Sequence, residues 1–138
     1  MTSTISPDTA LVYVMVVVSA SDRKMTNAEL KKIGEVVRSI PAFRRYDREN
    51  LIRDSRNCAA IVADEDEGLD AVLGLAREAL PKSHLDTAYV LACEVAAADG
   101  RFTREEIRIL ERIRRGLGLD RLAASAIERA VTARLRTF

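Results

Sequence analysis

Two pairs of acidic residues stand at matching places in the chain and could together hold a metal ion. Asp22 is followed seven residues later by Glu29, and Asp99 is followed seven residues later by Glu106. Carboxylate oxygens without histidine or thiolate partners suit hard cations such as Ca²⁺, Mg²⁺ or Mn²⁺. The spacing is not that of an EF-hand loop, because Leu110 stands where the twelfth-position glutamate would be. If the two pairs converge, they predict a site for one divalent cation.

The acidic pairs belong to an internal repeat with an offset of 77 residues. Residues 14–36 read VMVVVSASDRKMTNAELKKIGEV, and residues 91–113 read LACEVAAADGRFTREEIRILERI. Each copy has an apolar helical stretch, small residues, an aspartate, a short turn, Thr-x-x-Glu and a second helical pattern. The repeat predicts two pseudo-symmetric helix–turn–helix units, over about residues 10–40 and 85–117.

The same turns also have a purely structural interpretation. Thr103 and Glu106 have the spacing of a capping box, in which each side chain accepts a hydrogen bond from the backbone N–H of the other residue. Thr26 and Glu29 repeat this spacing, although the first copy has Arg23 where the second has a glycine. An aspartate at a helix C-terminus opposes the helix dipole by ~0.3–1 kcal/mol unless a cation or amides lie nearby. The turns therefore allow two interpretations, ordinary helix caps or a shared cation site.

The elements that must position these residues are helices. The chain has 138 residues, 48% of them apolar and only 4% aromatic, a composition typical of packed helices in one domain. We therefore expect a single domain over residues 1–138. The net charge of +1 gives the whole molecule no electrostatic basis for binding nucleic acid.

The secondary structure of one apolar run can be predicted only by comparison with the other copy of the repeat. Leu11–Val18 (LVYVMVVV) is β-branched and far shorter than the ~20 apolar residues that span a bilayer. Periodicity alone does not distinguish a buried strand from a buried helix here. The matching stretch of the second copy, Ala88–Val95 (AYVLACEV), is helical in character. We therefore predict a helix over residues 9–21, against local propensity.

Periodicity and helix-breaking residues predict six further short helices. They are expected to begin near Thr26, Asp47, residues 64–67, Ser83, Thr103 and Asp120, and Ser83 is expected to cap the fifth helix. Pro41 and Pro81 end two of them, and the glycines Gly116 and Gly118 end the sixth. The short connections favour an all-α fold, a single compact bundle of about seven short helices.

Other candidate chemistry is sparse, which argues against an enzyme. His84 is the only histidine and is expected at the surface, near a helix start. Cys58 and Cys93 lie within apolar helical patterns and are interpreted as buried, reduced thiols, which favours a reducing compartment. The arginines of residues 101–115 are interleaved with glutamates and predict a salt-bridged helix face. A basic patch for anionic lipid or an acidic partner is the alternative for this segment.

The repeated phrase D-[GR]-x-h-T-x-x-E-h resembles the TerB-like family of tellurite-resistance proteins. Its strongest part is Ala96–Leu119, AAADGRFTREEIRILERIRRGLGL, and the resemblance covers about Ala10–Asp120. The same fold occurs in the N-terminal domain of a membrane-anchored DnaJ-like co-chaperone. The resemblance implies about seven helices and a divalent-metal site made by Asp22, Glu29, Asp99 and Glu106.

The resemblance also implies a biological role. It suggests a non-enzymatic domain of the tellurite and chemical-stress response, working beside an integral membrane partner of the TerC type. Such a protein is expected in the cytoplasm, at the periphery of the inner membrane. We expect neither a J-domain nor a membrane span in this sequence, which argues against a full co-chaperone. The alternative is a metal-free protein–protein interaction scaffold of the co-chaperone type, whose turns are ordinary caps.

Overall fold

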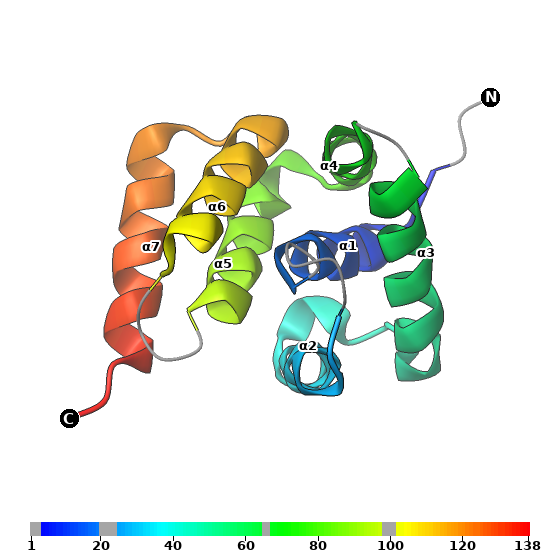
Figure 1. The fold of residues 1–138 in the computed structure, drawn as a ribbon, viewed down its shortest axis with the longest axis horizontal. Helices are drawn as coiled ribbons and strands as arrows, with labels where there is room; N and C mark the ends of the chain where they lie inside the picture. Colours follow the sequence, from blue (N-terminus) through cyan, green and yellow to red (C-terminus); the bar gives the residue numbers. More distant parts are fainter. Residues whose placement is uncertain (1–3, 20–24, 65–66, 98–101) are drawn as a thin grey trace.

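The apolar run near the start of the chain forms the central helix of the fold. In the computed structural model, which describes residues 4–19, 25–64, 67–97 and 102–138, α1 extends over Pro7–Ser19. All residues from Ala10 to Ser19 are buried, and Figure 1 shows the helix enclosed by its neighbours. A helix that is apolar on every side is stable only in such a place. The prediction of a helix against local propensity is confirmed.

Six further α-helices and three short 3₁₀ segments follow among the described residues, which contain no strand. The α-helices are α2 (Asn27–Ser39), α3 (Leu51–Asp64), α4 (Gly68–Ala79), α5 (Leu85–Ala96), α6 (Arg104–Leu117) and α7 (Arg121–Leu135). The 3₁₀ segments are η2 (Pro41–Phe43), η3 (Arg48–Asn50) and η4 (Lys82–His84). The predicted all-α bundle of about seven helices is confirmed. None of the described helices has the length and apolarity needed to cross a bilayer.

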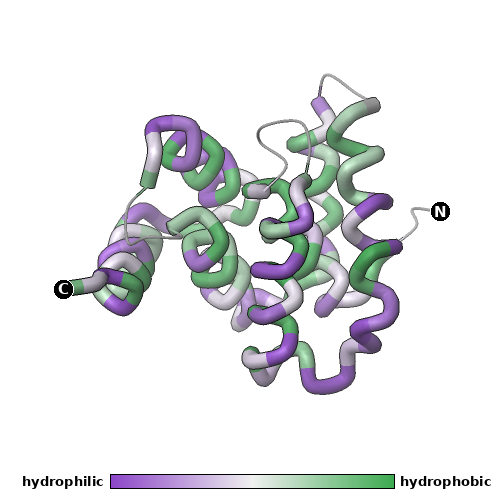
Figure 2. Tube along the Cα trace, turned by 60° about the horizontal axis from the view of Figure 1, so that its bottom comes forward, coloured by the Kyte–Doolittle hydropathy of each residue, from purple (hydrophilic) through white to green (hydrophobic). Residues whose placement is uncertain are grey.

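The helices pack in two groups that share one hydrophobic core. Helix α1 contacts α2, α3, α4, α5 and α6, while α6 packs against α4 and α5, and α7 packs against α5. Buried residues from all seven helices belong to one apolar cluster. Figure 2 shows hydrophobic positions gathered where the helices face one another and hydrophilic positions at the outer turns. The interior is therefore continuous across the two predicted repeat units.

Both ends of the α6–α7 connection follow the sequence prediction, with one exception. Asp120 caps α7, since its Oδ1 accepts a hydrogen bond from the Ala123 N–H at 2.8 Å. Gly118 ends α6 in the left-handed conformation, with φ 72°, which glycine adopts without steric cost. Gly116 lies inside α6 and does not end it. A Cβ at this position would lie 2.7 Å from Leu73 Cδ1, so the glycine permits α6 to approach α4 closely.

The prediction that Ser83 caps the fifth helix is wrong. Ser83 lies within η4, and the residue that precedes α5 is His84, whose side chain makes no capping hydrogen bond. The His84 N–H bonds to the Pro81 carbonyl at 2.9 Å, so a 3₁₀ turn takes the place of the predicted cap. The Ser83 hydroxyl lies 2.9 Å from His84 Nδ1 instead, and His84 is exposed, as predicted.

Candidate metal centre

Each copy of the repeat contains a complete capping box. In the first copy, the Thr26 hydroxyl accepts a hydrogen bond from the Glu29 N–H at 3.1 Å, and Glu29 Oε1 accepts one from the Thr26 N–H at 2.8 Å. In the second copy, the equivalent distances between Thr103 and Glu106 are 3.2 and 2.7 Å. Each box satisfies two backbone N–H groups that a helix start leaves without partners. The predicted caps are confirmed in both copies.

The local sequence explains why the two boxes have the same geometry. Thr26 has φ −81° and ψ 163°, and Thr103 has φ −75° and ψ 169°, both in the extended region that threonine favours. Each glutamate lies in the first turn of its helix, where the dipole stabilises negative charge. The carboxylates of Glu29 and Glu106 are therefore held in fixed orientations at the starts of α2 and α6.

Two of the four acidic residues predicted to bind a cation are described by the structure. Asp22 and Asp99 lie outside the described residues. Glu29 and Glu106 are partly exposed, and the hydrogen bonds among the described residues use only Oε1 of each. In that part of the chain, no group of three or more histidine, cysteine or acidic side chains is close enough to hold a metal ion.

The two capping boxes stand apart in the fold. In Figure 1, α2 begins below α1, whereas α6 begins on the side of the molecule occupied by α5 and α7. Within residues 4–19, 25–64, 67–97 and 102–138, no hydrogen bond joins Glu29 to Glu106. A shared ion would therefore require Asp22 and Asp99 to complete the ligand set between the two helix starts. The convergence of all four acids on one ion stays a prediction.

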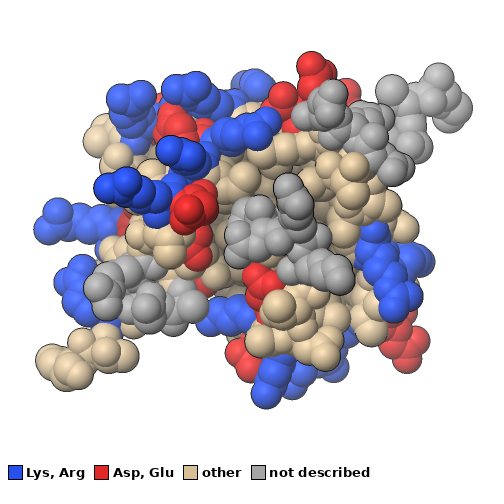
Figure 3. Space-filling view, viewed as in Figure 1, with Lys and Arg blue, Asp and Glu red and all other residues tan. Residues whose placement is uncertain are grey.

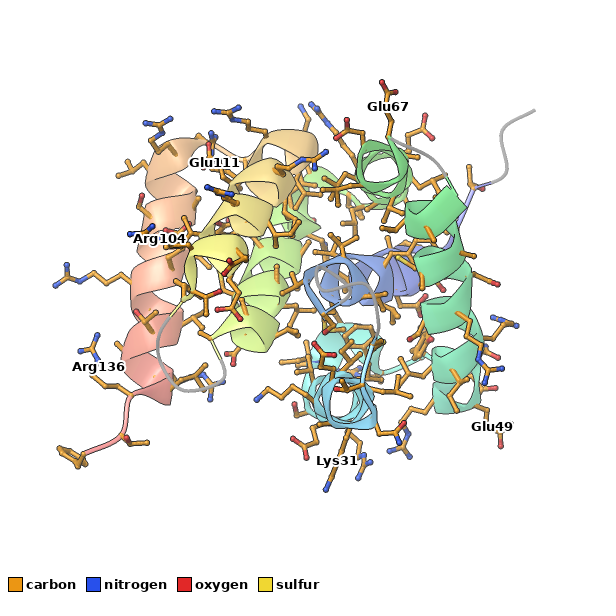
Figure 4. The ribbon with its side chains drawn as sticks, viewed as in Figure 1. Lys31, Glu49, Glu67, Arg104, Glu111 and Arg136 are labelled. Carbon is orange, nitrogen blue, oxygen red and sulfur yellow. The ribbon has the colours of Figure 1, made fainter. Side chains whose placement is uncertain are left out.

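The arginine-rich helix α6 carries an ion-pair network. Glu111, which is labelled in Figure 4, lies on this helix. Its Oε1 accepts hydrogen bonds from Arg114 Nη2 at 2.7 Å and from Arg115 Nε at 3.1 Å. The bond from Arg114 is the main reason that the pKa of Glu111 falls to about 2. Arg112 pairs with Asp70 of α4 at 3.2 Å. The predicted salt-bridged face is present, and Figure 3 shows further Lys and Arg side chains gathered over α6 and the adjacent end of α7.

Two buried tyrosines donate hydrogen bonds to carboxylates that the sequence analysis did not single out. The Tyr46 hydroxyl donates to Asp54 Oδ2 at 2.6 Å, and Thr9 Oγ1 donates to the same oxygen at 3.3 Å. The Tyr89 hydroxyl donates to Glu128 of α7. Burial first, and then the carboxylate partner, raises the pKa of each tyrosine. These bonds tie α1 to α3 and α5 to α7, which is a structural role.

The two cysteines are buried and unpaired, as predicted. The Cys58 thiol donates to the Tyr13 carbonyl, with sulfur and oxygen 3.6 Å apart. Burial raises the pKa of both Cys58 and Cys93 to about 12, so neither has the thiolate character of an activated nucleophile.

The family of the chain follows from a comparison with protein-family models. The model described as Tellurite resistance protein TerB matches residues 8–129, which is most of the chain. The chain belongs to the TerB family. No curated protein and no solved structure matched it. The family resemblance that the repeated motif indicated is thus confirmed. In this TerB chain, the two capping boxes are the described part of the predicted metal centre.

Proposed function

We propose that this TerB chain is a non-enzymatic module of the tellurite and chemical-stress response that binds one divalent cation. The ligands would be the carboxylates of Asp22, Glu29, Asp99 and Glu106, and the ion Ca²⁺, Mg²⁺ or Mn²⁺. Family membership supports the link to tellurite resistance. The repetition of an Asp–turn–Thr-x-x-Glu unit at an offset of 77 residues supports the metal site.

The observation that carries this proposal is the hydrogen bonding of the Glu29 and Glu106 carboxylates. Each accepts a cap N–H through Oε1, and the other oxygen, Oε2, takes part in none of the hydrogen bonds among the described residues. The cap thus orients each carboxylate and leaves an oxygen for a ligand. A pre-oriented ligand loses little side-chain entropy when a cation binds.

We also propose a protein partner for this chain, an integral membrane protein of the TerC type, and a location in the cytoplasm beside the inner membrane. The resemblance to the TerB-like family is the support for the partner. The two unpaired, buried thiols support a reducing compartment. Affinity capture of the chain from membranes and from cytosol, with and without chelator, tests both points. Recovery of a membrane protein that chelator abolishes would support them, and capture of nothing from membranes would contradict them.

The metal proposal can be tested apart from the cap. In Glu106→Gln, the side-chain amide oxygen can still accept the Thr103 N–H, because glutamine also completes a capping box. The variant therefore removes the charged ligand and keeps the cap. Its neighbour Glu105 is exposed, so Glu105→Gln is a control with the same change of charge.

Calorimetric titration with Ca²⁺, Mg²⁺ and Mn²⁺ compares the native chain with these variants and with Asp99→Asn. We expect one-site binding of at least one ion, weakened about tenfold or more in Glu106→Gln and Asp99→Asn and unchanged in Glu105→Gln. Equal weakening in the control would mean a non-specific charge effect. The absence of binding by the native chain would overturn the metal site.

A metal-free scaffold of the co-chaperone type is the second candidate. One observation favours it: both capping boxes are complete without an ion, and so the glutamates have a sufficient structural role. If calorimetric titration showed no cation binding by the folded chain, the metal-free scaffold would replace the metal-binding module as the proposed function. The chain would then act through a surface that binds a partner helix.

A further inference from the structure

We propose that a hollow lined by three arginines, between the C-terminus of α2 and η3, is a binding site for a phosphate group. This hollow, the arginine pocket, has a volume of about 350 Å³ and is lined in part by Arg38, Arg44 and Arg48. Its remaining wall includes the apolar residues Ile40 and Phe43. None of these residues belongs to the proposed cation site, so each proposal can fail without the other.

The chain reversal after α2 brings Arg38, Arg44 and Arg48 to the wall of one pocket. Arg38 lies in the last turn of α2, and Pro41 then begins η2. The Arg44 N–H bonds to the Pro41 carbonyl at 3.0 Å, which tightens the turn that carries Arg44. The buried rings of Phe43 and Tyr46 stack edge to face with centroids 5.7 Å apart and fix the turn to the core. The three arginines therefore come from the end of α2, from the turn after η2 and from η3.

The arginine pocket has an excess of positive charge. The side chains of Arg38, Arg44 and Arg48 are exposed, and no ion pair among the described residues includes them. No carboxylate lines the pocket. Between residues 38 and 56 the sequence has six arginines and three acidic residues. Asp54, one of the three, is buried and already accepts hydrogen bonds from Tyr46 and from Arg53.

A neighbouring hollow shows the contrast. It has a volume of about 490 Å³ and shares Arg44 with the arginine pocket, but its wall includes the Asp8 carboxylate. A carboxylate in the wall repels an anion, whereas the arginine pocket presents only cationic and neutral groups. The anion is therefore assigned to the arginine pocket.

The number and type of the cationic groups indicate the ligand. A guanidinium group is planar, always charged, and can donate two parallel hydrogen bonds to an oxyanion. Three such groups suit a terminal phosphate, which has three oxygens and close to two negative charges at neutral pH. A carboxylate has two oxygens and one charge and would leave a guanidinium without a partner. The C-terminus of α2 carries partial negative charge and does not attract an anion. Recognition of the phosphate would therefore depend on the three arginines.

The test uses the full chain titrated with sodium phosphate, and separately with acetate, at constant ionic strength. We expect saturable phosphate binding that is tighter than acetate binding, and an affinity about tenfold or more weaker in Arg44→Gln and in Arg48→Gln. Arg56→Gln is the matched control, because Arg56 is exposed on α3, loses the same charge and does not line the pocket. Circular dichroism verifies that each variant is folded.

A second arm distinguishes free phosphate from a lipid headgroup. The chain is floated with phosphatidylcholine vesicles that contain or lack phosphatidic acid. Flotation that requires phosphatidic acid and Arg44, and that free phosphate competes away, would assign the site to lipid-borne phosphate. Binding in solution without flotation would assign it to a soluble phosphate compound. The proposal is overturned if no saturable binding occurs below about 10 mM in either arm, if acetate binds as tightly, or if Arg56→Gln weakens binding equally.

Discussion

Replacing Thr103 by alanine removes one half of the second capping box. The Thr103 hydroxyl accepts the Glu106 N–H at 3.2 Å, and alanine offers no acceptor. The second hydrogen bond of the box, from the Thr103 N–H to Glu106 Oε1 at 2.7 Å, can remain because its donor is a backbone group that alanine also has. Thr103 is exposed, so the substitution leaves no cavity in the core. The expected loss is therefore that of a single helix cap.

The loss of a threonine cap costs about 1 kcal/mol of unfolding free energy. For a domain of this size, that change lowers the melting temperature by about 3–5 °C. Thr103→Ser keeps a hydroxyl acceptor and is expected to stay within about 0.5 kcal/mol of the native chain. Thr26→Ala removes the equivalent hydroxyl of the first box and is expected to cost a similar amount, since both caps have the same geometry.

Urea unfolding followed by far-ultraviolet circular dichroism measures these differences. We expect a lower urea midpoint for Thr103→Ala with an unchanged slope of free energy against urea, and a native-like midpoint for Thr103→Ser. A midpoint for Thr103→Ala equal to that of the native chain would refute the cap as a source of stability. Equal losses in the alanine and serine variants would show that something other than the hydroxyl is responsible.

Three further predictions concern packing, pH and thiol reactivity. Gly116→Ala should destabilise the fold by about 1 kcal/mol or more in urea unfolding, because its Cβ would press on a buried leucine of α4. Gly74→Ala, which has open space around its Cβ, should instead stabilise it by about 0.5–1 kcal/mol, and a loss at Gly74 would contradict the packing argument. Glu111→Gln should make the unfolding free energy fall less steeply as the pH is lowered below 4.5. The pKa of Glu111 is lowered from 4.5 to about 2 in the folded chain, so its contribution is present above pH 4.5 and is lost as the pH falls towards 2. Urea unfolding between pH 2 and 6 measures this pH dependence. If the unfolding free energy of Glu111→Gln fell with pH as steeply as that of the native chain, the contribution of the Glu111 ion pairs would be disproved. Cys58 and Cys93, whose pKa values burial raises to about 12, should react with a thiol reagent at pH 8 only after denaturation, and rapid labelling of the native chain would contradict their burial.

Patterns local in sequence predicted the helices and most of their ends. The run Leu11–Val18 favours a strand by propensity, yet the repeat indicated a helix because its counterpart is rich in alanine. Burial on all sides then outweighs the small cost of β-branched residues in α1. Thr103 and Asp120 were predictable as caps because each acts on a backbone N–H three residues away.

Features that depend on distant contacts or on the exact course of a turn were not predictable. Ser83 has the sequence of a cap, but the geometry after Pro81 places a 3₁₀ turn there. Asp54 lies in register with the buried positions of α3, which signals a partnered charge, but nothing in the sequence identifies Tyr46 as that partner. The arginine pocket likewise exists only because the chain reverses after α2. Of the candidate metal site, the capping role of the glutamates was predictable and is observed.

The most direct test of the proposed cation site is a crystal structure of the native chain soaked with Mn²⁺, recorded with anomalous scattering. We expect one anomalous peak between the starts of α2 and α6, with carboxylate oxygens of Asp22, Glu29, Asp99 and Glu106 within about 2.6 Å of the ion. A map without such a peak, or with the two acidic pairs directed to opposite sides of the molecule, would contradict it.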